Sequence, residues 1–202
     1  MSDLLDQLAV ADLITRERWA RDNRMFDEMA KFYHPDSVVE TTWFTGSGAE
    51  FVERSRAAVR EGLINFHVMS PSIVTLNGDR ALAETPASLR NFWQVDGVDG
   101  SIEAFVKLMW RAVRTDHGWQ IAGLRVIYVR DLLHACNPTR PPQFDQEKLN
   151  QYRACCRYQS YHLARLGLEP SQDMVGEDRP ETVAALRRGE QVWLAGDRKV
   201  EA

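Results

Sequence analysis

Cysteine is scarce in this sequence. The chain has 3 cysteines in 202 residues, and two of them, Cys155 and Cys156, are neighbours. Three thiols cannot form a framework of paired disulfides. Because adjacent side chains diverge on a helix, we expect buried thiols rather than metal ligands or a redox pair.

Long apolar runs and an excess of one charge are missing as well. No stretch approaches the ~20 apolar residues of a membrane-spanning helix, and no charged-then-apolar leader precedes Ser2. The formal net charge is −4, with acidic and basic residues interspersed, which argues against a nucleic-acid partner. We therefore expect a soluble, cytoplasmic protein that binds neither membranes nor nucleic acids.

Motifs typical of cofactor sites are also lacking. The sequence contains no clustered metal-ligand spacing, no Gly-rich phosphate loop and no nucleophile elbow. The prediction that remains is a mechanism that uses neither a metal nor another cofactor.

What the sequence does contain is a β-rich segment from Phe66 to Asp131. Its runs cover Ser72–Leu76, Arg80–Val95, Ile102–Arg114 and Trp119–Arg130, and its turns fall at Asn77–Asp79, Asp96–Gly100 and Thr115–Gly118. Turns of this composition supply positive φ and end strands. Strands well above ~10 residues exceed the usual length. We therefore expect a strongly curved antiparallel sheet, whose concave face must be filled by a helix or by a ligand.

Helical spacing is found on both sides of this segment. The expected helices run from Asp3 to about Asn23, Met25 to Tyr33, Ala49 to Glu61, Asp145 to Leu166 and Pro180 to Leu194, with a further strand from Ser37 to Phe44. This order predicts an α+β fold with its helices gathered on one face of the sheet.

A proline-rich connector from Asn137 to Pro142 divides the chain, because it can form neither a helix nor a central strand. We expect one domain at residues 1–135 and a C-terminal helical extension at residues 136–202. The extension shows no catalytic spacing, and we interpret it as a lid or an oligomer clasp.

Two ionisable residues are placed where chemistry could occur. Asp22 ends the first expected helix, which must pack into the mouth of the curved sheet, and His67 begins a strand among apolar neighbours. A carboxylate beside an imidazole in an apolar pocket makes a general base, because it fixes the tautomer and stabilises the imidazolium. The structural alternatives are a helix cap or solvated charge for Asp22 and a satisfied structural histidine for His67.

Several short motifs occur in a specific order. They are Asp12–Ile14 ahead of Asp22, Phe32–Val39, Trp43–Phe51, His67 ahead of Asn77–Ala81, and Gly118–Ile121 ahead of Tyr128–Asp131. With them the sequence resembles the SnoaL-like branch of the nuclear transport factor 2-like superfamily over roughly Leu4 to Leu132. The resemblance implies a cone-shaped α+β barrel, in which a strongly curved antiparallel sheet wraps around N-terminal helices. It also implies a homo-oligomer, with a trimer favoured.

The resemblance suggests roles for particular residues. In dehydratase-type members, such as scytalone dehydratase, bile acid 7α-dehydratase and hexachlorocyclohexane dehydrochlorinase, an Asp and a His form the catalytic dyad, and Asp22 and His67 match them. Where relatives carry Lys or Tyr, this chain has Glu17, either a buried proton donor or a surface partner of Arg21. Relatives also carry an Arg on the last strand. Arg125 is the nearest candidate, one residue out of phase, and such a slip turns a side chain to the other face.

Other candidates for substrate binding depend on which side of each strand faces the hollow. On the strand from Arg80, the inward side carries either a guanidinium, from Arg90, or an apolar surface with one amide. The residues of the second alternative are Leu89, Asn91 and Trp93. The aromatic residues that could line the pocket are Trp43, Phe66, Trp93, Phe105, Trp110 and Tyr128.

The expected function is a cofactor-independent lyase, of the dehydratase type or a related elimination, acting on a small, apolar, cyclic or aromatic substrate. His67, oriented by Asp22, removes a proton, and Arg90, Arg125 or Tyr33 assists the leaving group. A retro-aldol deformylation or an isomerisation starts with the same base and stays open. The alternative from another class is a non-catalytic ligand-binding or assembly protein, similar in architecture to the small subunit of ring-hydroxylating oxygenases.

Overall fold

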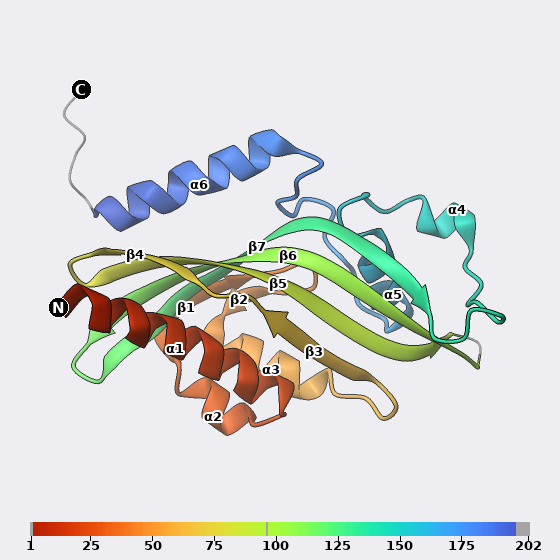
Figure 1. Cartoon of the computed structure of the whole chain (residues 1–202), viewed down its shortest axis with the longest axis horizontal. Helices are drawn as coiled ribbons and strands as arrows, with labels where there is room; N and C mark the ends of the chain where they lie inside the picture. Colours follow the sequence, from red (N-terminus) through yellow and green to blue (C-terminus); the bar gives the residue numbers. More distant parts are fainter. Residues whose placement is uncertain (1, 96, 197–202) are drawn as a thin grey trace.

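The structure of the protein is a computed structural model that describes residues 2–95 and 97–196 (Figure 1). Asp96 of the second expected turn and residues 197–202 of the expected extension lie outside the described residues. The helices are α1 (Ser2–Asp22), α2 (Phe26–Ala30), α3 (Gly48–Ala57), α4 (Gln146–Leu149), α5 (Arg157–Arg165) and α6 (Pro180–Ala195). The strands are β1 (Tyr33–Glu40), β2 (Thr45–Ser47), β3 (Ile64–Met69), β4 (Ile73–Asn77), β5 (Arg80–Val95), β6 (Val98–Thr115) and β7 (Gly118–Ala135).

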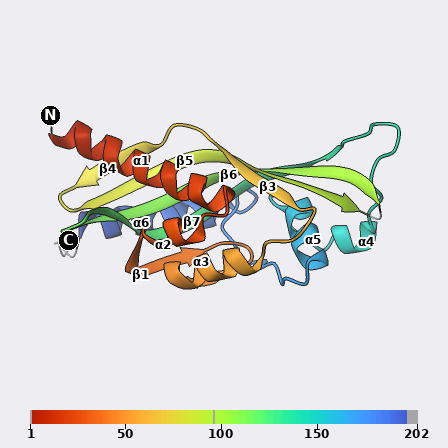
Figure 2. The ribbon, with the colours of Figure 1, turned by 90° about the horizontal axis from the view of Figure 1, so that it is seen from below.

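The strands form one curved sheet in the order β2-β1-β7-β6-β5-β3, with β4 paired to the other end of β5. Strands β5, β6 and β7 have 16, 18 and 18 residues, and they curve around α1, α2 and α3 (Figures 1 and 2). The predicted α+β fold with a strongly curved sheet, N-terminal helices and additional C-terminal helices is confirmed. One pairing departs from the antiparallel pattern, because β1 runs parallel to β7.

The two faces of the long strands carry different cores. Trp110 and Leu124 belong to the main core, which also contains residues of α1 and α3. Their neighbours Met109 and Ile127 point the other way and pack against Val183 and Leu186 of α6. Figure 1 accordingly shows α6 on the face opposite to α1. The prediction that all helices gather on one face is wrong, because the middle of the outer face is apolar too and requires a cover of its own.

Two expected helices differ from those observed. The helix expected to reach Tyr33 ends at Ala30, and Tyr33 already belongs to β1. Pro35 is tolerated in that strand because the β1–β7 register shifts between Tyr33 and Val38. The helix expected over Asp145–Leu166 is divided into α4 and α5. Asp131 accepts a hydrogen bond from the backbone N–H of Gln159 at 2.8 Å and thereby caps the start of α5.

The expectations for thiols and apolar residues are met unevenly. Cys155 and Cys156 are buried, as expected, and Cys136 is exposed. The start of α1 is less buried than its apolar stripe suggests, because Leu4, Leu5 and Leu8 are exposed in the single chain. None of the helices in residues 2–95 and 97–196 has the length and hydropathy needed to span a membrane.

Candidate active site

Asp22 and His67 are in direct contact. Asp22 is the last residue of α1, and one of its oxygens, Oδ1, lies 2.8 Å from His67 Nδ1. Its other oxygen, Oδ2, accepts a hydrogen bond from the backbone N–H of His67 at 2.7 Å. An ionised carboxylate only accepts hydrogen bonds, so Nδ1 carries the ring proton and Nε2 keeps its lone pair. The His67 side chain is 6% exposed and that of Asp22 13%.

A buried ion pair lies beside the Nε2 atom of His67. Arg18 Nη1 is 3.4 Å from His67 Nε2, and Arg18 Nη2 is 2.9 Å from Glu17 Oε2. Tyr33 donates a hydrogen bond to Glu17 Oε1 at 2.8 Å. Neither partner of the Arg18–Glu17 pair reaches solvent appreciably. Moving two charges from water into the protein interior costs free energy. A buried ion pair at this position is therefore a poor way to stabilise the fold.

Burial and charge keep the imidazole neutral. Burial, followed by the nearby positive charge of Arg18, lowers the pKa of His67 to about 4, although Asp22 acts in the opposite direction. For Asp22, burial raises the pKa, but the hydrogen bonds from His67 and the positive charge of Arg18 lower it, and the pKa is lowered overall. At neutral pH, His67 is therefore an uncharged acceptor beside an ionised carboxylate.

The contribution of Arg18 to this state can be measured. Replacing the buried pair together, as Glu17→Gln/Arg18→Met, avoids leaving an orphan charge and is expected to raise the pKa of His67 towards 6.5, because Arg18 lowers it. NMR titration of the imidazole carbon-bound protons measures the change. The exposed pair on the same helix, replaced as Asp12→Asn/Arg16→Met, is the matched control. An unchanged or lower pKa in the first variant would contradict this account of the site.

His67 lines a small cavity of about 60 Å³. Its wall contains Arg18 and Arg21 of α1. The apolar or aromatic part is formed by Trp43, Phe51, Leu89, Ala104, Val106, Leu108, Leu124, Val126 and Tyr128. Gln159 of α5 closes it from the C-terminal part of the chain. The volume is less than half of the ~150 Å³ that accommodates benzene. It therefore accommodates a small reacting group, but not a large ligand as a whole.

Arg21 also lies in this wall, where its guanidinium packs against an aromatic ring. Its guanidinium lies 5.5 Å from the centre of the Phe51 ring, and its Nε atom is buried with no hydrogen-bond partner in the described part of the chain. Both oxygens of the adjacent Asp22 are already engaged by His67. Together with Arg18, this side chain places N–H donors beside the imidazole. The arrangement suits an oxyanion that develops while His67 accepts a proton.

The structure brings some of the sequence-predicted residues to this cavity. Trp43 and Tyr128 line it together with His67, and Tyr128 Oη accepts a hydrogen bond from Thr42 N at 3.0 Å. Glu17 and Tyr33 are not part of the cavity lining. Glu17 contacts Arg18, and Tyr33 contacts Glu17. Of the two alternatives for Glu17, the surface pairing with Arg21 is therefore wrong, and Glu17 is buried against Arg18 instead.

Six other candidates are absent from the cavity lining. Arg125 is on the outer face of β7, paired with Glu40 and Glu190, because the one-residue slip turns it outward. Arg90 is paired with Glu103 on the same outer face, since Leu89 is the inward neighbour.

Four of these candidates are aromatic. Phe105 is exposed, and Trp110 packs in the main core. Phe66 alternates with His67 and stacks on Phe92 at 6.1 Å. Trp93 shares the inward side with Leu89, but it lies further along β5 and packs against His162 at 4.5 Å. The apolar alternative for the strand from Arg80 is thus the observed one, and its amide, Asn91, donates a hydrogen bond to Gln159 at 2.8 Å.

Sequence reasoning missed Arg18 and Arg21 as cavity residues. A signal was available, because Arg18 falls in the apolar stripe of the first helix and Arg21 follows three residues later, next to Asp22. A cation inside an apolar stripe indicates burial with a partner. Gln159 gave no such signal, because its place depends on how α5 docks.

A small α+β barrel with an Asp–His pair enclosed beside its first helix is the class of protein that the fold and site define. The model of the SnoaL-like domain matches residues 2–125. The chain belongs to the SnoaL-like family.

Similar proteins are found in fungi and bacteria. Pea pathogenicity protein 2 of Fusarium vanettenii is 28% identical over 201 residues, which cover 94% of this chain and 86% of that protein. A type 2 hexachlorocyclohexane dehydrochlorinase superposes with a TM-score of 0.58 at 18% identity, covering 70% of this chain and 97% of that one. A putative scytalone dehydratase of Novosphingobium aromaticivorans superposes with a TM-score of 0.54 at 13% identity, covering 71% of this chain and 97% of that one. At these identities the structural matches establish the shared fold.

Proposed function

We propose that this protein is a lyase or isomerase whose reaction starts with removal of a proton from carbon, with His67 as the base and Asp22 as its partner. The observation that carries the proposal is the Nε2 atom of a neutral, carboxylate-held imidazole that lines a small cavity. This atom accepts only a long hydrogen bond, of 3.4 Å, from Arg18. Membership of the SnoaL-like family and the dehydratase and dehydrochlorinase among the structural neighbours support it.

The proposed substrate is a carbonyl compound with a leaving group on the β-carbon. His67 Nε2 takes the proton from the α-carbon, and the electron pair of that bond moves into an enolate. Asp22 stabilises the imidazolium, while Arg18 and Arg21 donate hydrogen bonds to the enolate oxygen. Collapse of the enolate expels the β-substituent. When the substituent is hydroxide, it takes the proton from His67 and leaves as water, which restores the base.

Deuterium exchange tests this chemistry without knowledge of the natural substrate. The probe is 4-hydroxy-2-butanone in D₂O, with exchange at the α-carbon and formation of methyl vinyl ketone followed by proton NMR. Because the pKa of His67 is about 4, the enzyme-dependent rate is expected to stay level between pH 8 and about pH 5. An imidazole of ordinary pKa would be almost fully protonated at pH 5 and would lose most of its rate. Exchange no faster than in buffer, or a rate that falls near pH 6.5, would refute the assignment.

A further inference from the structure

The wall of the barrel has a gap beside the dyad cavity. On one edge of β7, the pairing with β1 ends at Glu40 opposite Arg125. The next partner on this edge is the C-terminal segment, where Tyr128 N donates to Val175 O at 3.0 Å and Glu177 N donates to Tyr128 O at 2.9 Å. Within the described chain, the edge at Val126 and Ile127 has no strand partner between these two.

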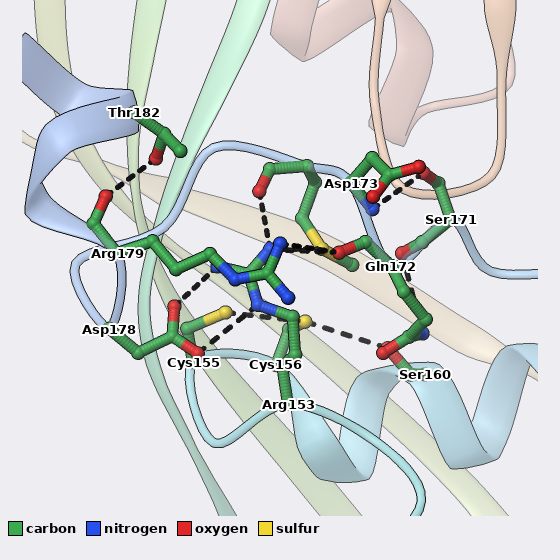
Figure 3. A network of polar contacts seen from close by, with 11 residues as sticks. Arg153, Cys155, Cys156, Ser160, Ser171, Gln172, Asp173, Asp178, Arg179 and Thr182 are labelled. Carbon is green, nitrogen blue, oxygen red and sulfur yellow. Dashed lines mark hydrogen bonds and ion pairs between the residues drawn. The ribbon is translucent and has the colours of Figure 1, made fainter.

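The C-terminal segment 171–177 completes a closed frame around this gap. Ser171 N donates to Thr42 O at 2.7 Å, which joins the segment to the end of β1. Arg153 also binds this segment. Its Nη1 atom donates to Gln172 O at 3.0 Å and to Met174 O at 2.5 Å. Its Nη2 atom is paired with Asp178 (Figure 3). The frame is thus held by backbone hydrogen bonds and a nearly buried arginine, so the gap is a fixed feature of the fold.

An open cleft of about 550 Å³ lies over this gap, below α6. Its apolar lining includes Val126, Met174, Val175, Ala185 and Leu186. The cleft shares three residues with the dyad cavity, namely Thr41, Val126 and Tyr128. Single side chains therefore separate the two spaces, and the cleft is of the size typical of small-molecule sites.

Most of the charged groups around the cleft are paired with one another, and Asp173 is a further acidic residue of its lining. Arg125 is paired with Glu40 and with Glu190 of α6. The part of a ligand that lies here therefore meets a mainly apolar surface, with one acidic residue, Asp173, in the lining. Inside the cavity the situation is reversed, because Arg21 has no hydrogen-bonding partner for its Nε atom in the described chain.

We infer that the substrate is an amphipathic small molecule that enters through this gap. Its polar, oxyanion-forming head reaches Arg18, Arg21 and His67, and its apolar body remains in the outer cleft under α6. The inference rests on the proposed function for the identity of the head. It accounts for a cavity of about 60 Å³ next to a cleft of about 550 Å³, because neither space alone combines the base with room for an apolar body.

Binding of unreactive carboxylates tests the two compartments separately. The probes are acetate and octanoate, measured by calorimetry and competition at pH 7. Each methylene group buried in the cleft is expected to tighten binding about fourfold. The variant Ala185→Trp, which fills the cleft, is expected to abolish the advantage of octanoate and to leave acetate binding unchanged. Ala184→Trp is the matched control, since Ala184 is also exposed on α6 but lies outside the cleft lining.

Two results in these binding experiments would contradict the inference. Equal octanoate binding by Ala185→Trp and Ala184→Trp would overturn it, as would octanoate binding no tighter than acetate in the wild type. Arg21→Gln is expected to weaken the binding of both probes by a similar factor. Unchanged binding would mean that the polar head of the ligand does not contact Arg21 in the cavity. Failure of the proposed function shows elsewhere, as the absence of deuterium exchange, because neither carboxylate reacts.

Discussion

Replacing His67 with alanine is expected to reduce enzyme-dependent exchange of 4-hydroxy-2-butanone by about 10²–10⁴-fold, the usual contribution of a positioned general base. The fold should survive, because the backbone N–H of residue 67 still donates to Asp22 Oδ2. NMR exchange rates and circular dichroism measure the two properties. An active, folded His67→Ala variant would end the proposal of His67 as the base.

The partner residue provides a sharper comparison. Asp22→Asn removes the charge that stabilises the imidazolium, so it is expected to slow the exchange as well. The double variant Asp22→Asn/His67→Ala is expected to be no slower than His67→Ala, because groups that act as a unit have non-additive effects. Fully additive losses would mean that Asp22 acts independently of His67. The exposed turn residue His117, replaced by alanine, is the matched control.

Acidification from pH 7 to pH 4 is expected to cost the protein about 3 kcal/mol of unfolding free energy. Burial lowers the pKa of both His67 and His162 to about 4. Between pH 6.5 and pH 4 the unfolded chain therefore binds protons that the folded chain does not, so stability present above pH 6.5 is lost as the pH falls. Protonation of each histidine therefore lowers the unfolding free energy by about 3 kcal/mol, at 1.36 kcal/mol per pKa unit.

Asp131 acts in the opposite direction. Burial raises its pKa to about 6, so its ionised form destabilises the folded state above pH 6. This cost of about 3 kcal/mol disappears as the pH falls towards 4, and it offsets one of the two histidine losses.

Urea unfolding of the wild type and variants at both pH values measures this balance. His162→Gln is expected to lose about 3 kcal/mol less than the wild type on acidification, whereas the exposed control His117→Gln should follow the wild type. An equal loss in His162→Gln and the control would show that burial does not hold His162 neutral.

Much of the architecture followed from local chemistry. The turns at Asn77–Asp79 and Thr115–Gly118 mark the ends of β4, β5, β6 and β7, because Gly, Asn and Asp adopt turn conformations that other residues avoid. Strand length implied curvature. The spacing of motifs around Asp22 and His67 directed attention to two residues that the structure places 2.8 Å apart, and their catalytic role is the proposal to be tested.

Side-chain direction on the long strands was beyond the sequence. When both faces of a strand are covered, apolar residues occupy both, and the alternation that would define the inward side disappears. Both sides therefore stayed open for Arg90, whereas Arg125 was already one residue out of phase with the position expected to face the cavity. Only the register with neighbouring strands and the position of α6 assigned them to ion pairs outside the barrel.

The sequence by itself determined the order of the elements, the curved sheet and the pair of residues worth testing, because turn chemistry, strand length and motif spacing are local properties. The tertiary structure decided which side chains meet at the cavity and where the barrel wall stays open. Those outcomes depend on contacts between distant segments, such as Thr42 with Ser171 and Tyr128 with Val175, and no local pattern encodes them.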